Sequence, residues 1–153
     1  MITSVSDRFC IKNTCHETLY YPSGTKSCEL YTMNNNLHRE GDNPSEIHYY
    51  SNGLKSIEIF IKEGVMHRDG DKPAYIRYNN DGTIRFKSYY KDGKMHRDRG
   101  PANIEYHEDG QMASEAYYSN NHLHRSDGPA IVKYNKHGKI IDSTFIVNEN
   151  SNG

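Results

Sequence analysis

The segment Met66-His67-Arg68-Asp69-Gly70-Asp71-Lys72-Pro73-Ala74-Tyr75-Ile76-Arg77-Tyr78 decides the fold, because the chain repeats its pattern. A Met or Leu followed by His-Arg recurs with spacings of 29, 29 and 28 residues. Self-similarity at a fixed period is typical of repeat architectures, in which each unit packs mainly on its neighbours. The recurring pairs are His38-Arg39, His67-Arg68, His96-Arg97 and His124-Arg125.

Other residue types keep the same period, and together they define five units, the first of them degenerate. Prolines recur at Pro44, Pro73, Pro101 and Pro129. Glycines recur at Gly24, Gly53, Gly82, Gly110 and Gly138. Aromatic residues recur at Tyr31, Phe60, Tyr89, Tyr117 and Phe145. A second turn position recurs at Asn35, Gly64, Gly93 and Asn121.

Each unit is predicted to contain two β-strands. Apolar residues alternate with polar ones between Ala74 and Tyr78, and a period of two indicates a strand with one drier face. Asn80-Asp81-Gly82 then predicts a tight hairpin, and a second strand follows from Ile84 to Tyr90. The proline before each first strand cannot donate to a sheet ladder, so each unit is expected to begin there.

These patterns predict an all-β repeat protein, an elongated and twisted antiparallel meander of about five β-hairpins. We expect one domain over residues 1–153, with residues 1–14 as an N-terminal cap and 148–153 as a frayed tail. The hairpin repeats are expected at residues 15–43, 44–72, 73–100, 101–128 and 129–147.

Composition limits the classes of partner. Only 34% of the chain is hydrophobic, which favours stacked small units over a thick core. The 19 basic and 20 acidic residues are interspersed, so no long-range field attracts nucleic acid or an anionic membrane. No stretch resembles a signal peptide or a membrane span. We expect a soluble protein of the cytoplasm.

The four histidines are interpreted as structural. Equivalent positions in neighbouring units lie about 9–10 Å apart, which is too far for two side chains to share one metal ion. We expect each histidine to bond a backbone group of the linker, and each arginine to pair with a nearby acid. The expected acids are Glu40, Asp69, Asp98 and Asp127 for Arg39, Arg68, Arg97 and Arg125.

The cysteines all lie in the first unit, as Cys10, Cys15 and Cys28. An odd number without partners elsewhere is a poor basis for disulfides and favours idle thiols in a reducing compartment. Together with His16 they offer four zinc ligands, although the spacing matches no common finger. No metal and no cofactor are predicted, and the zinc alternative stays open.

The repeat Met-His-Arg-Asp-Gly-Asp-Lys-Pro-Ala at 66–74, and Leu-His-Arg-Ser-Asp-Gly-Pro-Ala at 123–130, carry a resemblance. The chain resembles MORN-like (membrane occupation and recognition nexus) hairpin repeats. It is more similar to the His-Arg-x-Asp-Gly-Pro-Ala repeat proteins of bacteriophages and large DNA viruses. The resemblance covers residues 20–147 and implies a sheet used as a binding scaffold, with no shared chemistry.

A non-enzymatic protein-binding module is therefore the leading hypothesis, since no catalytic motif emerges. With the viral resemblance, we expect a phage or viral protein that binds and inhibits a host protein, such as a CRISPR-type defence component. The candidate contact residues are the aromatic row Tyr31, Phe60, Tyr89, Tyr117 and Phe145 and the four repeat arginines.

Three alternatives remain. In the first, the tyrosines of the aromatic row stack a ligand or a nucleic acid. In the second, the chain acts as an antitoxin or immunity protein. An open sheet also predicts a homodimer through an edge strand.

Overall fold

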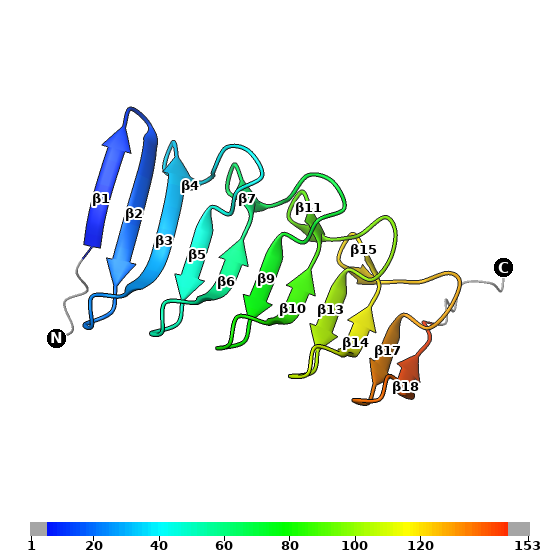
Figure 1. Ribbon diagram of the computed structural model, residues 1–153. Helices are drawn as coiled ribbons and strands as arrows, with labels where there is room; N and C mark the ends of the chain where they lie inside the picture. Colours follow the sequence, from blue (N-terminus) through cyan, green and yellow to red (C-terminus); the bar gives the residue numbers. More distant parts are fainter. Residues whose placement is uncertain (1–5, 147–153) are drawn as a thin grey trace.

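A computed structural model describes residues 6–146, and all of its regular elements are β-strands. Eleven strands form one antiparallel path through the main sheet, and a twelfth, β4, pairs with the end of β3. Hairpins stand side by side in chain order, so the sheet is a single extended layer (Figure 1). The predicted all-β antiparallel meander is confirmed.

The main sheet begins with one extra strand that the repeat pattern did not predict. The β1 strand lies inside the expected N-terminal cap and pairs along its whole length with β2. Its first four strands are β1 (Ser6–Ile11), β2 (Thr14–Tyr20), β3 (Lys26–Met33) and β4 (Asn36–Leu37). Four hairpins follow: β5 (Glu46–Tyr49) and β6 (Lys55–Ile59), β9 (Tyr75–Tyr78) and β10 (Ile84–Ser88), β13 (Asn103–Tyr106) and β14 (Met112–Ala116), β17 (Ile131–Tyr134) and β18 (Ile140–Thr144).

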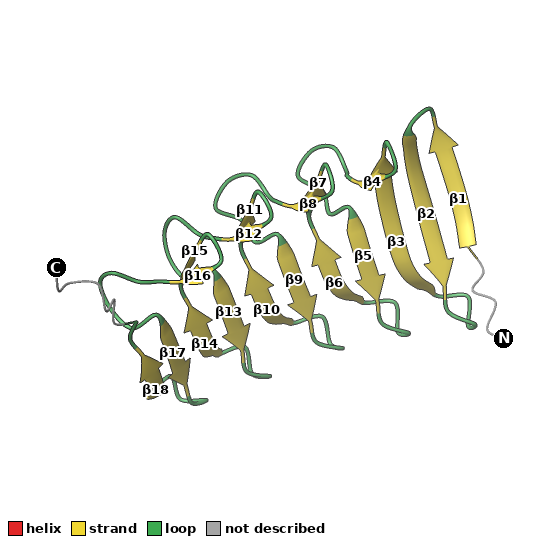
Figure 2. Cartoon of the chain, turned by 180° about the vertical axis from the view of Figure 1, so that it is seen from behind, coloured by secondary structure: helices red, strands yellow, loops and turns green. Residues whose placement is uncertain are grey.

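Three short two-stranded sheets stand at one end of the main strands (Figure 2). They are β7 (Ile61–Lys62) with β8 (Val65–Met66), β11 (Tyr90–Lys91) with β12 (Lys94–Met95), and β15 (Tyr118–Ser119) with β16 (His122–Leu123). In the three middle units the long second strand predicted from the sequence is therefore divided at its aromatic residue, whereas β3 of the first unit runs unbroken through Tyr31. The amide of Phe60 bonds Ala74 across the main sheet, whereas its carbonyl accepts from His67 on the returning strand.

The turns that close these short hairpins explain why the second turn position of each repeat is either Asn or Gly. Both central residues have positive φ, for example Glu63 at 52° and Gly64 at 81°. Such paired left-handed residues match the twist of a two-residue hairpin, and Asn and Gly adopt them at least cost.

The two faces of the sheet differ in composition. Residues that are partners on neighbouring strands point to the same face. The isoleucine face carries Ile47, Ile76, Ile104 and Val132, which are all buried. On the charged face the next residues along the same strands are His48, Arg77, Glu105 and Lys133. The expected drier and wetter sides are therefore present. Within residues 6–146 no helix is long and apolar enough to cross a membrane.

The core is thin and lies on the isoleucine face. Its central cluster is Phe60, Ala74 and Ile76, against which Met66 and Tyr78 pack. Alanine or serine follows each of the four repeat prolines, and these small residues are completely buried beside the aromatic row. The expected tail at 148–153 lies outside the described residues.

Candidate protein-binding surfaces

Each of the first four rings of the aromatic row lies under an arginine of its own unit. The guanidinium carbon of Arg68 is 3.6 Å from the centroid of the Phe60 ring, and that of Arg97 is 3.9 Å from Tyr89. Only 5% of Phe60 and 8% of Tyr89 is exposed. The equivalent pairs are Arg39 on Tyr31 and Arg125 on Tyr117.

The same arginines also hold the start of the next unit. The Nη1 group of Arg68 donates to the carbonyl of Pro73 at 3.1 Å, and Arg97 donates to Pro101 at 3.3 Å. A guanidinium that stacks on a ring and bonds a carbonyl fixes the path of the linker between them. Most of the row proposed as a contact surface is thus occupied within the protein. Phe145 is the exception, with 63% of it exposed.

The acids paired with these arginines differ from the predicted ones. Arg68 donates from Nε to Asp42 at 2.6 Å, and Arg97 bonds Asp71 with two nitrogens at 2.6 and 2.7 Å. Both acids belong to the preceding linker, so the pairs join neighbouring units. Of the expected pairs, only Arg125 with Asp127 is present; Arg39 has no ion pair among the described residues.

The linker ion pairs shift the ionisation of their acids. Hydrogen bonds from Arg68 and Lys72 hold the pKa of Asp42 well below its usual range. The hydrogen bond from Arg97 likewise lowers the pKa of Asp71. Both carboxylates are therefore charged partners across the joint at neutral pH.

The histidines join units in a different way from the one predicted. The Nδ1 atom of His38 accepts from the amide of Glu63, and that of His67 accepts from the amide of Asp92, both at 3.0 Å. Each contact reaches the short hairpin turn of the following unit, rather than the linker. The other ring nitrogen faces the predicted arginine acid, as with His67 and Asp69 at 3.1 Å. In His38, an Nδ1 that accepts from an amide leaves the ring proton on Nε2, which faces Glu40.

Glutamates on the isoleucine face, of which Glu29 and Glu58 are buried, form a feature that the repeat pattern did not reveal. Tyr49 donates its hydroxyl to Glu29, and Lys26 reaches the same carboxylate at 2.9 Å. Burial by itself would raise the pKa of Glu29, but these two hydrogen bonds outweigh it and leave the pKa lowered. Equivalent bonds link Tyr78 to Glu58 and Tyr134 to Glu115.

The third unit departs from this pattern. Lys87 occupies the position of the glutamate, and its ammonium lies 5.3 Å from the centroid of the Tyr106 ring. In each of the other three pairs the tyrosine follows the glutamate by 19 or 20 residues. This regular spacing in the sequence would have revealed the pairs.

A cavity of about 490 Å³ lies between two successive linkers, over Tyr89. Five basic residues line it, but Arg68, Arg97 and Lys72 are paired with linker acids. Its charge is thus mostly neutralised from within. Its walls are the segments 67–72, 89–91 and 96–99.

The charged face holds a larger hollow of about 780 Å³ over β9 and β10, reaching Glu105 of β13. Tyr75 and Phe86 meet edge to face at its floor, with ring centroids 6.0 Å apart. Met66, Tyr90 and Met95 from the short hairpins also line it. Arg85 and Glu105 form an ion pair of 3.2 Å at its side. This cluster is not visible in the repeat pattern, because its members occupy different positions of the repeat.

The two terminal strands leave apolar side chains uncovered. On β18 and just after it, Ile141 is 64% exposed and Ile146 is 40% exposed. On β1, Phe9 is 66% exposed. Each of these strands has a pairing partner on one side only among residues 6–146.

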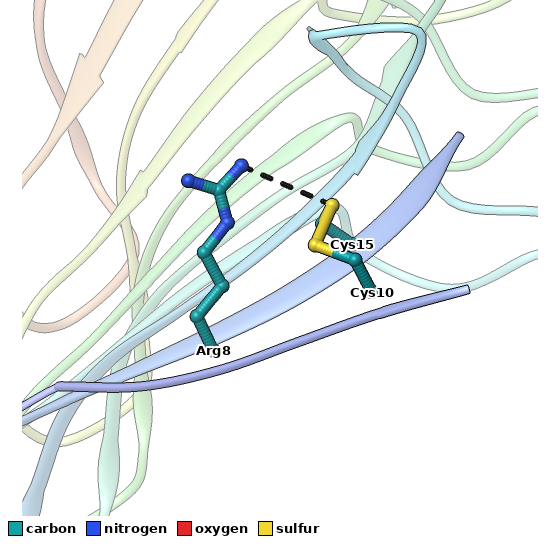
Figure 3. The surroundings of a disulfide bond; sticks show 3 residues. All are labelled: Arg8, Cys10 and Cys15. Atoms are coloured by element: carbon teal, nitrogen blue, oxygen red, sulfur yellow. Dashed lines mark hydrogen bonds between the residues drawn. A yellow bond between two sulfur atoms is a disulfide. The ribbon is translucent and has the colours of Figure 1, made fainter. Parts of the chain in front are cut away.

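The cysteine prediction was wrong for two residues, because Cys10 and Cys15 form a disulfide across the β1–β2 hairpin (Figure 3). Arg8 donates toward Cys15 Sγ at 3.8 Å. His16 stacks on Tyr31 on the isoleucine face, with ring centroids 4.3 Å apart. Cys28 is opposite His48 on the charged face. The four residues considered for zinc therefore do not form one site.

Comparisons with known proteins give no relationship for this chain. A scan against protein-family models, a search of curated proteins and a search of solved structures each return no match.

Proposed function

We propose that this chain is a non-enzymatic protein-binding module whose docking surface is the hollow on the charged face. The observation that carries the proposal is the cluster of Tyr75, Phe86, Tyr90, Met66 and Met95 around one open concavity. Aromatic residues and methionine are enriched at the centres of protein interfaces, and methionine adapts its shape to a partner.

The charges around the hollow favour a protein over a nucleic acid. Arg77 and Arg85 are balanced by Glu105 and Glu108 in its lining. A phosphate backbone would need an excess of positive charge, which supplies most of the affinity in such complexes. A protein surface of mixed charge needs none.

The identity of the partner is a finer proposal that depends on the repeat resemblance. In it, the chain is a phage or viral protein that acts in the host cytoplasm by binding and inhibiting a host protein, such as a CRISPR-type defence component. In that compartment the Cys10–Cys15 pair would be reduced.

The test is affinity capture from host lysate, followed by titration of the purified partner. Phe86→Ser removes a floor residue of the hollow, and Leu54→Ser changes an exposed leucine of the β5–β6 turn outside it. Loss of an interface centre costs about 2 kcal/mol or more, so we expect binding at least ~30-fold weaker for Phe86→Ser alone. No stoichiometric partner, or equal affinities for both variants, would contradict the proposal.

Two alternative functions have specific support. The uncovered apolar residues of β18 favour homodimerisation through that edge; light scattering should then show a dimer that Ile141→Lys converts to monomer. The cavity over Tyr89 favours a small ligand, which a thermal shift with nucleotides or a mobility shift of single-stranded RNA would reveal. An antitoxin role would be indicated by a toxic gene next to this one.

A further inference from the structure

On the charged face, the strands β3 and β5 bring three different metal-ligating side chains together. Cys28 on β3 lies directly opposite His48 on β5, and Glu46 precedes His48 by two residues on the same face. One ligand atom from each residue lies within 4.8 Å of the other two. Glu46 Oε1 and His48 Nε2 are already 2.6 Å apart.

The trio is a departure from the repeat rather than a consequence of it. In the next unit the positions of Cys28, Glu46 and His48 are held by Ile57, Tyr75 and Arg77. In the third joint they are held by Phe86, Asn103 and Glu105. The fold therefore does not need these ligands for its hydrogen bonds or its packing, and only the first joint combines them.

We propose that Cys28, Glu46 and His48 form a site for a divalent transition-metal ion, with zinc as the best match. Thiolate, imidazole and carboxylate are the ligands zinc takes in proteins, at about 2.0–2.3 Å. Around a tetrahedral ion such ligands lie roughly 3.3–3.8 Å from one another. Side-chain rotations that move the ligand atoms by about 1 Å would convert the present arrangement into that geometry, with the ion taking the place of the proton between Glu46 and His48.

The surroundings fit such an ion. Cys28 is only 7% exposed, so its sulfur is protected. Burial, together with the charges of Glu46, Glu29 and Glu17, raises the pKa of the Cys28 thiol to about 11. A thiol must lose its proton to bind a metal, so metal uptake at this site would be accompanied by proton release.

Three protein ligands leave one position open. Glu17 on β2 lies on the same face, because its partner Leu30 is also the partner of Glu46. The fourth ligand is thus water, and Glu17 adds negative charge near the site. The site is separate from the hollow proposed for protein binding, whose lining includes none of the trio.

The test begins with chelator-treated full-length protein, titrated with Zn²⁺ in competition with a chromophoric chelator. One equivalent should bind, release protons and raise the unfolding temperature. Co²⁺ should give a tetrahedral spectrum with a sulfur-to-metal charge-transfer band. Cys28→Ser should remove that band, and Cys28→Ser and His48→Ala should each weaken Zn²⁺ binding by more than the ~10–100-fold typical of outer-shell changes.

The matched control is the double variant Cys10→Ser/Cys15→Ser, which removes the other two cysteines. It should bind one equivalent with unchanged affinity, and circular dichroism should show that all variants keep the sheet. No stoichiometric binding by the wild-type protein would overturn the proposal. Binding that survives Cys28→Ser but is lost in the double variant would overturn it too, and would assign the metal to Cys10 and Cys15.

Discussion

The guanidinium of Arg68 has three partners from three parts of the chain. It stacks on Phe60, donates to the carbonyl of Pro73 and pairs with Asp42 of the previous linker. A lysine ammonium cannot make all three contacts, because it lacks the planar fork and donates from a single point. The recurrence of arginine at this position of the repeat is thus explained by geometry as well as by charge.

Replacement of this arginine should destabilise the fold. Arg68→Ala removes a largely desolvated cation–π contact and a charged hydrogen bond, so we expect a loss of about 1–3 kcal/mol in the free energy of unfolding. Arg68→Lys should recover less than half of it. Denaturant unfolding measures the change, with the exposed Arg99→Ala as control. Wild-type stability of Arg68→Ala would show that the stack contributes nothing.

The buried carboxylate of Glu29 depends on its tyrosine. Tyr49→Phe leaves one oxygen of a buried charged group without its donor, and we expect a loss of about 1–3 kcal/mol. Tyr106→Phe is the matched control, because the equivalent position opposite it is Lys87 and its ring is engaged by its face. Thermal and denaturant unfolding of both variants should separate them by at least about 1 kcal/mol. Equal effects would contradict the assigned bond.

The short hairpins are the elements most sensitive to backbone conformation. Gly93 has φ of 75°, and the equivalent positions in other units are Asn35 at 65° and Asn121 at 70°. Gly93→Asn should therefore change stability by less than about 0.5 kcal/mol, whereas Gly93→Val should cost about 1–2 kcal/mol. A built Cβ would lie 3.7 Å from Val65, so conformation rather than space decides the result. Equal stabilities of the two variants, measured by urea unfolding, would refute this.

The ion pairs between linkers should stabilise the fold less at acid pH. The pKa values of Asp42 and Asp71 are lowered by Arg68 and Arg97, so their contribution to stability is present above the unfolded pKa of about 4 and is lost as pH falls through the lower folded value. The unfolding temperature should drop between pH 5 and about pH 2. Asp42→Asn/Asp71→Asn should be less stable at pH 7 and show a smaller drop. A parallel decline of both proteins would exclude these pairs as its cause.

Element type could be predicted from the sequence because turn residues and alternation agree in every unit. The division of the second strand in the three middle units could not, since strand propensity continues through Phe60-Ile61 and only the hydrogen bond from His67 shows the change of partner. The hollow was also hidden. It combines Tyr75, Phe86 and Met95 from different repeat positions, and only the register of three hairpins brings them together.

As a whole, the molecule is a one-layer row of hairpins in which each unit contacts its two neighbours. Inner strands are paired on both sides, whereas β1 and β18 are paired on one side and are exposed along their length. Stability in such an array is approximately a sum of unit and interface contributions. The ends should therefore open more often than the middle.

Hydrogen exchange read by mass spectrometry should show this gradient. We expect the slowest exchange in β9, β10 and β13, and the fastest among paired strands in β18. A second copy bound to the β18 edge would protect that strand in a concentration-dependent way, so exchange at two protein concentrations separates the cases. Uniform protection from β1 to β18 at low concentration would contradict the nearest-neighbour description.

The histidine contacts have a direction along the chain. The rings of His38, His67 and His96 each accept from an amide that lies 24 or 25 residues closer to the C-terminus, in the turn of the next unit. During synthesis a unit can therefore complete its histidine contact only after the next hairpin has left the ribosome. Because all of these contacts are local in sequence, assembly can advance from the N-terminus one unit at a time, without a long-range search. A premature stop would leave a shorter array whose last unit lacks this histidine contact, rather than an unfolded chain.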